Sequence, residues 1–240
     1  MLQSLALPRY DLPRAGRALA ALLRDPDDLP QVFTLIDAVS GTAPHRLLFA
    51  FRRTEHGARL LRERPDIAKR LGDREALRAL PAGSLGRAYL EFVESEGLTP
   101  EGIRDASLEG SAISGRRRPE VFVYLHQRMR DTHDLWHAAT GYKGDVLGEI
   151  SLLAFTLAQN WNTAVALIVV TALAKGLGRG NVELILDGYR RGRSAAWLPA
   201  QDWESLLALP LEDVRERLRL GSPPAYTPVR TTELRAQGVL

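Results

Sequence analysis

Apolar residues recur every three to four positions along most of the chain, which is the spacing of an amphipathic helix. Residues 84–96 show this spacing well, because a serine that can cap a helix is followed by one face with Leu85, Tyr89 and Phe92. The strict alternation of apolar and polar residues that is typical of a strand is scarce. The pattern therefore predicts an all-α protein.

Glycine and proline divide this pattern into short segments. Short helices are predicted at 14–24, 29–39, 44–53 and 73–80, another begins at Thr99 with proline in its first turn, and a longer helix is expected at 120–140. Residues 221–240 begin with a stretch rich in glycine and proline and predict an irregular tail. No internal repeat or low-complexity linker divides residues 1–240, so we interpret them as a single-domain multi-helix bundle.

Composition narrows the classes of function. The 240 residues are 45% hydrophobic and 25% charged, which is ordinary for a soluble globular protein. Lys and Arg number 32 against 29 Asp and Glu, a net charge of +3, and both signs are interspersed, so we expect no nucleic-acid partner. Cysteine is absent, which excludes a disulfide framework, a thiolate nucleophile and a cysteine zinc site. A metal would need histidine, carboxylate or water ligands.

The most apolar stretch of the chain runs from Ala164 to Ala174 and has 11 residues. A membrane-spanning helix needs about 20. We therefore interpret this stretch as a helix that is buried or that rests on a membrane. The N-terminal residues lack the apolar run and cleavage site of a secretory signal, and cysteine is absent, so we expect a reducing compartment. The composition, rich in alanine, leucine and arginine, favours a bacterial cytoplasm, with peripheral attachment to the inner membrane.

Residues 133–149 read HDLWHAATGYKGDVLGE and combine the groups that can hold a metal. His133 and His137 are one helical turn apart, so their imidazoles can bind one cation. Asp134 points to the flank of the same helix. It can be a third ligand, a group that orients an imidazole, or a base that acts on bound water.

Glu149 follows on the next predicted helix, which begins at Asp145. Its spacing places it in line with Leu152 and Thr156, on the face expected to be buried. A lone carboxylate there would need a cation. Since a short turn makes the two helices antiparallel neighbours, Glu149 returns beside His137. We therefore predict a divalent-cation site with a position left open for water or substrate.

The pattern HDxxHx(11)E formed by His133, Asp134, His137 and Glu149 resembles the signature of the Coq4 family of ubiquinone (coenzyme Q) biosynthesis proteins. Residues 83–92 resemble a segment of that family, and so does a later region that contains Trp203, Leu211 and Arg215. The resemblance implies an all-helical protein, a homodimer, that works at a membrane surface with other ubiquinone biosynthesis proteins. It also implies that the four motif residues are metal-binding and catalytic, with zinc the expected ion and a redox metal the alternative.

Two functions follow from the resemblance. In one, the protein is a lyase that replaces the ring C1 carboxylate of a polyprenylated 4-hydroxybenzoate-derived intermediate by hydroxyl, in an oxidative decarboxylation. In the other, it is a non-catalytic, lipid-binding organiser of the biosynthetic complex. A third hypothesis, an HD-type metal phosphohydrolase, ranks last, because no upstream histidine or downstream aspartate stands in a matching context.

A polyprenyl tail needs an apolar groove. The two apolar helices after the motif supply the candidate lining residues, although packing in an ordinary core is the commoner role of such helices. The candidates are Leu152, Leu153, Ala164, Leu167 and Ile168. The basic cluster at Arg116–Arg118 can attract anionic lipid headgroups.

Overall fold

The computed structural model describes residues 10–112, 119–178 and 180–238. Every regular element within these ranges is a helix, and an isolated bridge between Ser84 and Pro210 is the one β-type pairing found in them. The prediction of an all-α fold is confirmed. The basic cluster Arg116–Arg118 lies outside the described residues.

The helices are mostly short. In chain order they are α1 (Leu12–Leu22), α2 (Leu29–Val39), α3 (Ala43–Arg52), α4 (Glu55–Glu63), α5 (Ile67–Gly72), α6 (Arg74–Arg78), α7 (Leu85–Ser95), α8 (Pro100–Ala112), α9 (Glu120–Asp131), α10 (His133–Thr140), α11 (Val146–Asn160), α12 (Thr163–Ala174), α13 (Val182–Ser194), the 3₁₀ helix η1 (Leu198–Ala200), α14 (Trp203–Leu206), α15 (Leu211–Leu218) and α16 (Thr231–Ala236).

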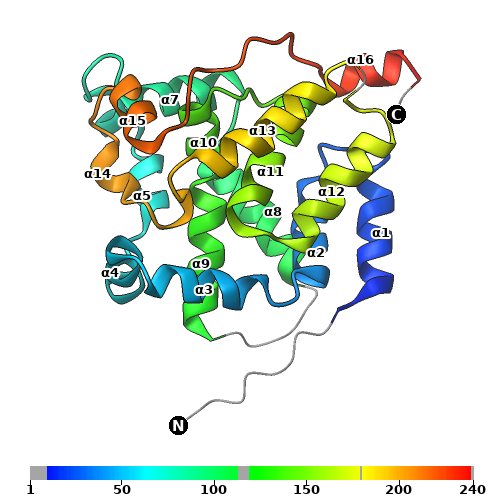
Figure 1. Ribbon diagram of the computed structural model, residues 1–240, viewed down its shortest axis with the longest axis horizontal. Coiled ribbons are helices and arrows are strands. Elements are labelled where there is room, and N and C mark those ends of the chain that lie inside the picture. The colour runs from blue at the N-terminus through cyan, green and yellow to red at the C-terminus, as the bar shows by residue number, and fades with distance from the viewer. Residues whose placement is uncertain (1–9, 113–118, 179, 239–240) are drawn as a thin grey trace.

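Helices α10 and α11 lie in the middle of the molecule (Figure 1). Helices α7, α9 and α15 contact α10, whereas α12 and α13 contact α11. The main core is formed where these helices meet, and its largest fully buried side chains include Trp136, Phe155 and Trp203. Burial of each such side chain contributes roughly 1.5–3 kcal/mol to folding.

Two glycines allow α13 to lie directly against α11. A Cβ atom at Gly188 would be 2.4 Å from the backbone oxygen of Ser151, and one at Gly192 would be 2.4 Å from the backbone oxygen of Phe155. Both distances are far below van der Waals contact. The four-residue spacing of the glycines places both gaps on one face of α13. This close packing fixes the position of α11, the helix that carries Glu149.

The prediction of one continuous helix over 120–140 is wrong, because the helix breaks at Thr132. The Thr132 hydroxyl donates to the backbone oxygen of Arg128 at 2.8 Å, and the backbone φ and ψ of Thr132 are −92° and −3°. Such a bond from a threonine to a carbonyl one turn earlier bends helices. His133 therefore begins a new helix, α10.

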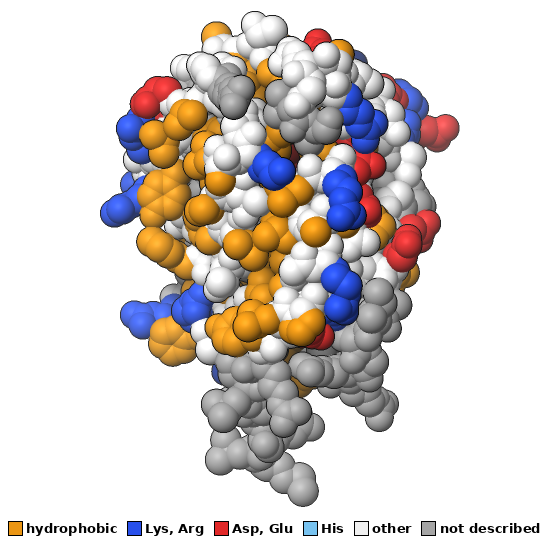
Figure 2. Space-filling view, turned by 90° about the vertical axis from the view of Figure 1, so that its right-hand side faces the viewer, with side chains coloured by type: hydrophobic (Ala, Val, Ile, Leu, Met, Phe, Trp, Pro, Cys, Tyr) orange, Lys and Arg blue, Asp and Glu red, His pale blue; other side chains and the backbone are white. Residues whose placement is uncertain are grey.

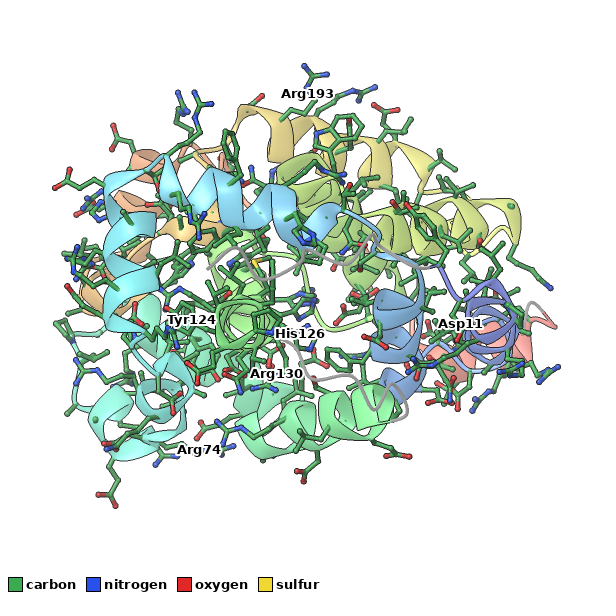
Figure 3. The ribbon with its side chains drawn as sticks, turned by 90° about the horizontal axis from the view of Figure 1, so that it is seen from below. Asp11, Arg74, Tyr124, His126, Arg130 and Arg193 are labelled. Atoms are coloured by element: carbon green, nitrogen blue, oxygen red, sulfur yellow. The ribbon has the colours of Figure 1, made fainter. Side chains whose placement is uncertain are left out.

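Helix α9 runs through the interior before this break. It contacts α3 and α8, and the view from below shows it end-on between these two helices, with Tyr124, His126 and Arg130 arranged around it (Figure 3). Arg128 on the same helix is buried and donates to both carboxylate oxygens of Glu204, at 2.8 and 2.9 Å. This ion pair ties the end of α9 to α14.

Two predicted starts of helices are confirmed, because Ser84 caps α7 and Asp145 caps α11. Gly141 ends α10 with a φ of +85°. The irregular tail expected from residue 221 extends to Arg230 and is followed by the short helix α16. No helix among the described residues is both long enough and apolar enough to cross a membrane.

Candidate metal centre

Three side chains converge between α10 and α11. His137 Nε2 lies 3.1 Å from Glu149 Oε1, and His133 Nε2 lies 3.7 Å from Glu149 Oε2. The candidate ligand atoms of the three residues all lie within 4.8 Å of one another, and in the described part of the chain no other group of this kind occurs. The structure thus brings together two helix neighbours and a glutamate from the next helix.

His137 is fixed by its surroundings. Its Nδ1 atom is 3.0 Å from the backbone oxygen of Tyr142. Since a carbonyl oxygen only accepts, Nδ1 must carry the hydrogen, and Nε2 therefore presents a lone pair. The Phe92 ring stacks on the imidazole with 4.9 Å between centroids and 12° between planes. Nε2 is buried and has no partner in hydrogen-bond geometry, although the Glu149 carboxylate is close.

His133 has the same arrangement with a different partner. Its Nδ1 atom is 3.2 Å from Asp134 Oδ1, and a carboxylate accepts, so the hydrogen is again on Nδ1 and Nε2 faces Glu149. Asp134 thus lies on the side of the His133 ring away from Glu149. In this position it orients the imidazole.

Glu149 is less buried than its helix position predicts. The expectation that it faces the core beside Leu152 and Thr156 is wrong for Glu149, because 42% of its side chain is exposed while both neighbours are buried. Glu149 lies in the first turn of α11, where the helix surface opens to solvent. The cluster is therefore closed around His137, whose side chain is 0% exposed, and open at Glu149.

Charge stabilises the ionised carboxylate in this cluster. Burial alone would raise the pKa of the Glu149 carboxyl, but the imidazoles of His137 and His133 outweigh it and lower that pKa to about 2. Burial would lower the pKa of His133, yet the hydrogen bond to Asp134 and the charges of Glu149 and Asp134 raise it. The Glu149 carboxyl is therefore ionised and available as a ligand.

The geometry fits a divalent metal. Zinc binds histidine nitrogen at about 2.0–2.1 Å and carboxylate oxygen at about 2.0–2.2 Å, so tetrahedral ligand atoms lie roughly 3.3 Å apart. The observed 3.1 and 3.7 Å are close to this value. The buried Nε2 of His137 is the clearest sign, because the Glu149 carboxylate lies 3.1 Å away and yet the two atoms are not in hydrogen-bond geometry. Three protein ligands leave a fourth position open.

An apolar groove meets the cluster at Glu149. It lies between α1, α2, α11 and α12, and most of the side chains that line it are aliphatic, among them Leu19, Val32, Ile150 and Ile168. Of the five residues predicted to hold a lipid tail, Ile168 lines this groove. The others lie nearby in different settings: Leu152 and Ala164 are fully buried, and Leu153 and Leu167 pack at the edges of core clusters.

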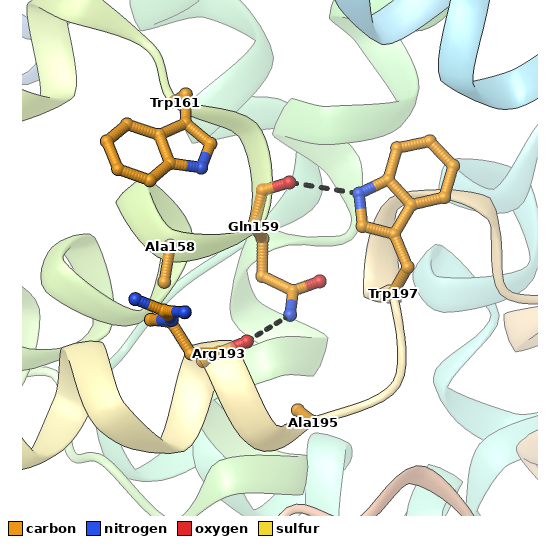
Figure 4. Close-up of a pocket in the computed structure, with 7 residues that line it drawn as sticks. Ala158, Gln159, Trp161, Arg193, Ala195 and Trp197 are labelled. Carbon is orange, nitrogen blue, oxygen red and sulfur yellow. Dashed lines mark hydrogen bonds between the residues drawn. The ribbon is translucent and has the colours of Figure 1, made fainter.

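A second pocket lies at the other end of α11 and has a volume of about 300 Å³ (Figure 4). Gln159, Trp161, Arg193 and Trp197 are among its lining residues. The Trp197 indole donates to the backbone oxygen of Gln159, and the Gln159 amide donates to the backbone of Gly192. Gln159 lies ten residues, or roughly 15 Å along the helix axis, from Glu149, so this pocket is separate from the candidate metal centre.

Three residues that support the site were not singled out for it by sequence reasoning. They are Phe92, Tyr142 and Tyr226, and the last donates a hydrogen bond to Asp145 at 2.9 Å. Phe92 and Tyr142 could have been identified from the sequence, because Phe92 lies in a segment that resembles the family and Tyr142 lies within the motif. Nothing in the local pattern around Tyr226 indicates a contact with the motif.

Comparison with known proteins identifies relatives along most of the chain. It is 32% identical over 186 residues to the "Ubiquinone biosynthesis protein COQ4 homolog, mitochondrial" of Bos taurus, covering 72% of this chain and 64% of that protein. It is 30% identical over 235 residues to the "Ubiquinone biosynthesis protein COQ4, mitochondrial" of Pyricularia oryzae, covering 95% and 75%. The chain thus spans about two thirds to three quarters of these relatives.

A solved structure has the same fold. The crystal structure of a protein from Nostoc punctiforme PCC 73102 matches with a TM-score of 0.65 and 23% identity, over 89% of this chain and 100% of that one. The family described as "Coenzyme Q (ubiquinone) biosynthesis protein Coq4" matches residues 12–224, which include the whole candidate centre. The chain therefore belongs to the Coq4 family of coenzyme Q (ubiquinone) biosynthesis proteins.

Proposed function

We propose that this protein is a metal-dependent enzyme of quinone biosynthesis. In this proposal it replaces the ring C1 carboxylate of a polyprenylated 4-hydroxybenzoate-derived intermediate by hydroxyl. The observation that carries the proposal is the position of the cluster: two imidazole nitrogens and the Glu149 carboxylate converge where an apolar groove opens. A polar reacting ring and an apolar tail would find matching surroundings side by side.

The chain's own residues set up the site for a cation. Nδ1 of His137 is held by the Tyr142 carbonyl and Nδ1 of His133 by Asp134, so both rings present Nε2 to the same point as Glu149. A divalent cation bound there would supply Lewis-acid stabilisation of carboxylate or phenolate oxygen, and zinc or a redox metal suits this ligand set. The Phe92 ring keeps water from one face of His137.

The reaction has a definite balance. The bond between C1 and the carboxyl carbon breaks and CO₂ leaves. A bond between C1 and the hydroxyl oxygen forms, which is a two-electron oxidation of the ring. We propose dioxygen as the oxidant. The overall reaction then converts the ring carboxylic acid, O₂ and water to the corresponding phenol, CO₂ and H₂O₂.

The outer surface supports attachment to a membrane. Figure 2 shows hydrophobic side chains gathered on the face that α1 and α12 form, with Lys and Arg side chains beside them. Leu12 on α1 and Val170 on α12 are 69% and 61% exposed. The apolar groove is bounded by the same two helices. A lipid-borne substrate would thus enter from the face best suited to meet a bilayer.

The test combines metal analysis with turnover. The parent, loaded in turn with zinc, iron, manganese or copper, is incubated in air with a short-chain prenylated 4-hydroxybenzoate labelled with ¹³C in the carboxylate. We expect stoichiometric metal, release of ¹³CO₂ and a hydroxylated product. Glu149→Gln should lose metal and product, while His56→Ala, which removes an exposed histidine, should keep both. Turnover by Glu149→Gln equal to that of the parent, or no product from the parent with any of the metals, would refute the proposal that the protein is an enzyme.

The second candidate is a lipid-binding organiser, which the groove beside Glu149 also favours. The two accounts differ in a cell that depends on this protein for quinone production. If His133→Ala abolishes quinone production while the variant is folded and still binds the other biosynthetic proteins, the enzyme is supported. If cells with His133→Ala keep normal quinone levels, the organiser is supported.

A further inference from the structure

The two helices of the candidate metal centre are joined by a short connection without helical structure. Helix α10 ends at Thr140 and α11 begins at Val146, so residues 141–145 set the position of Glu149 relative to His137. The tail at 221–230 has no helix of its own and crosses this connection. A backbone hydrogen bond fastens it there, since Val146 N donates to Val229 O at 3.0 Å.

One peptide group of the connection is held at both ends. Its carbonyl oxygen belongs to Tyr142 and accepts from His137 Nδ1 at 3.0 Å, and its N–H belongs to Lys143 and donates to the Tyr226 hydroxyl at 2.8 Å. Because the peptide unit is planar, these two bonds cannot be adjusted independently. A rotation that frees one end disturbs the other.

The hydroxyl passes its own hydrogen to a carboxylate. Tyr226 Oη donates to Asp145 Oδ2 at 2.9 Å. The other oxygen, Oδ1, accepts from Leu147 N at 3.1 Å and from Val229 N at 2.8 Å. Asp145 is 1% exposed, so this carboxylate is a buried anchor at the start of the helix that carries Glu149.

Space for the hydroxyl is provided by a glycine next to the metal-binding glutamate. A Cβ atom at Gly148 would lie 2.4 Å from Tyr226 Oη and 2.1 Å from the backbone oxygen of Lys143. Any side chain would displace the hydroxyl or open the connection. The absence of a side chain at Gly148 therefore allows the Tyr226 hydroxyl to approach the connection closely.

We propose that Tyr226 is a positioning residue of the metal centre, and that its hydroxyl links His137 to the Asp145 carboxylate through the Tyr142–Lys143 peptide group. The inference rests on the proposed metal site. All three donors point the same way, from imidazole to peptide, from peptide to hydroxyl and from hydroxyl to carboxylate, so each bond polarises the next. Histidine ligands commonly donate to a carboxylate directly, and loss of that partner weakens metal binding about 10–100-fold.

The test compares three conservative variants of the full chain. Tyr226→Phe removes the hydroxyl and keeps the ring. Tyr189→Phe removes a hydroxyl on α13, away from the connection. Arg230→Gln keeps the Tyr226 hydroxyl but weakens docking of the tail, because it breaks the ion pair with Glu96 at 2.7 Å and the bond to the backbone oxygen of Gly144 at 3.1 Å. For each folded variant we measure the zinc dissociation constant by competition with a chelator, and the His137 Nδ1–H resonance by NMR with labelled histidine.

We expect Tyr226→Phe to bind zinc about tenfold more weakly, with the His137 Nδ1–H proton moved upfield, and the other two variants to resemble the parent. Parent-like affinity and an unchanged resonance in Tyr226→Phe would overturn the positioning role alone. So would an equal loss of affinity in Arg230→Gln, because docking of the tail would then explain the effect. A parent that binds no zinc or other divalent metal refutes both this role and the proposed metal site.

Discussion

Replacement of Gly148 by alanine tests how tightly the connection is built. The added Cβ would meet a backbone oxygen at 2.1 Å and the Tyr226 hydroxyl at 2.4 Å. Overpacking of this kind costs about 1–3 kcal/mol, and loss of the two Tyr226 hydrogen bonds costs about 1 kcal/mol each. The better helix propensity of alanine offsets about 1 kcal/mol. We expect a net loss of about 2–4 kcal/mol in the free energy of unfolding.

Thermal unfolding followed by circular dichroism measures this loss. For a chain of this size, Tm should fall by roughly 5–15 °C. Gly16→Ala is the matched control, because Gly16 lies within α1 and its Cβ would meet nothing within 4 Å. That substitution should raise stability by up to about 1 kcal/mol. If Gly148→Ala raises Tm as Gly16→Ala does, the connection is looser than described and the reasoning fails.

Two further predictions concern charge. Glu204→Ala leaves Arg128, whose side chain is 1% exposed, without its carboxylate, and should lower the free energy of unfolding by about 3–5 kcal/mol; a loss below 1 kcal/mol in urea titrations would contradict this. In chelator-treated protein, the pKa of Glu149 is lowered from 4.5 to about 2, so its stabilising contribution is complete above pH 4.5 and is lost as pH falls through about 2. The raised pKa of His133 works in the opposite sense: its contribution is complete below its unfolded pKa of 6.5 and is lost as pH rises through the folded value. Urea titrations of the parent and Glu149→Gln across acid pH should therefore converge as the carboxylate is protonated, and curves that stay parallel would contradict the assignment.

The convergence of the three candidate ligands could be foreseen because it depends on local rules. One helical turn separates His133 from His137, and a short connection returns the chain to Glu149. The helix ends at Gly141 and Asp145 follow from capping preferences. All of these features lie within one span of 17 residues, 133–149, so tertiary packing has little room to alter them.

The remainder depends on contacts that no local pattern reports. The break at Thr132 arises because a side-chain hydroxyl competes for a helix carbonyl, and helical periodicity alone does not detect it. The exposure of Glu149 follows from where α1 and α2 leave a groove. The bond between Lys143 and Tyr226 spans 83 positions and requires the tail to be folded back across the connection.

That separation of 83 positions also sets an order of events during synthesis. At roughly 5–20 residues per second, a ribosome needs about 4–17 s to add Tyr226 after Lys143. For most of this interval a growing chain already carries both histidines and the glutamate, but not the hydroxyl that links His137 to Asp145. An ion captured by a nascent chain would be held by an unfinished site, and tight retention would begin only once the tail is made and docked.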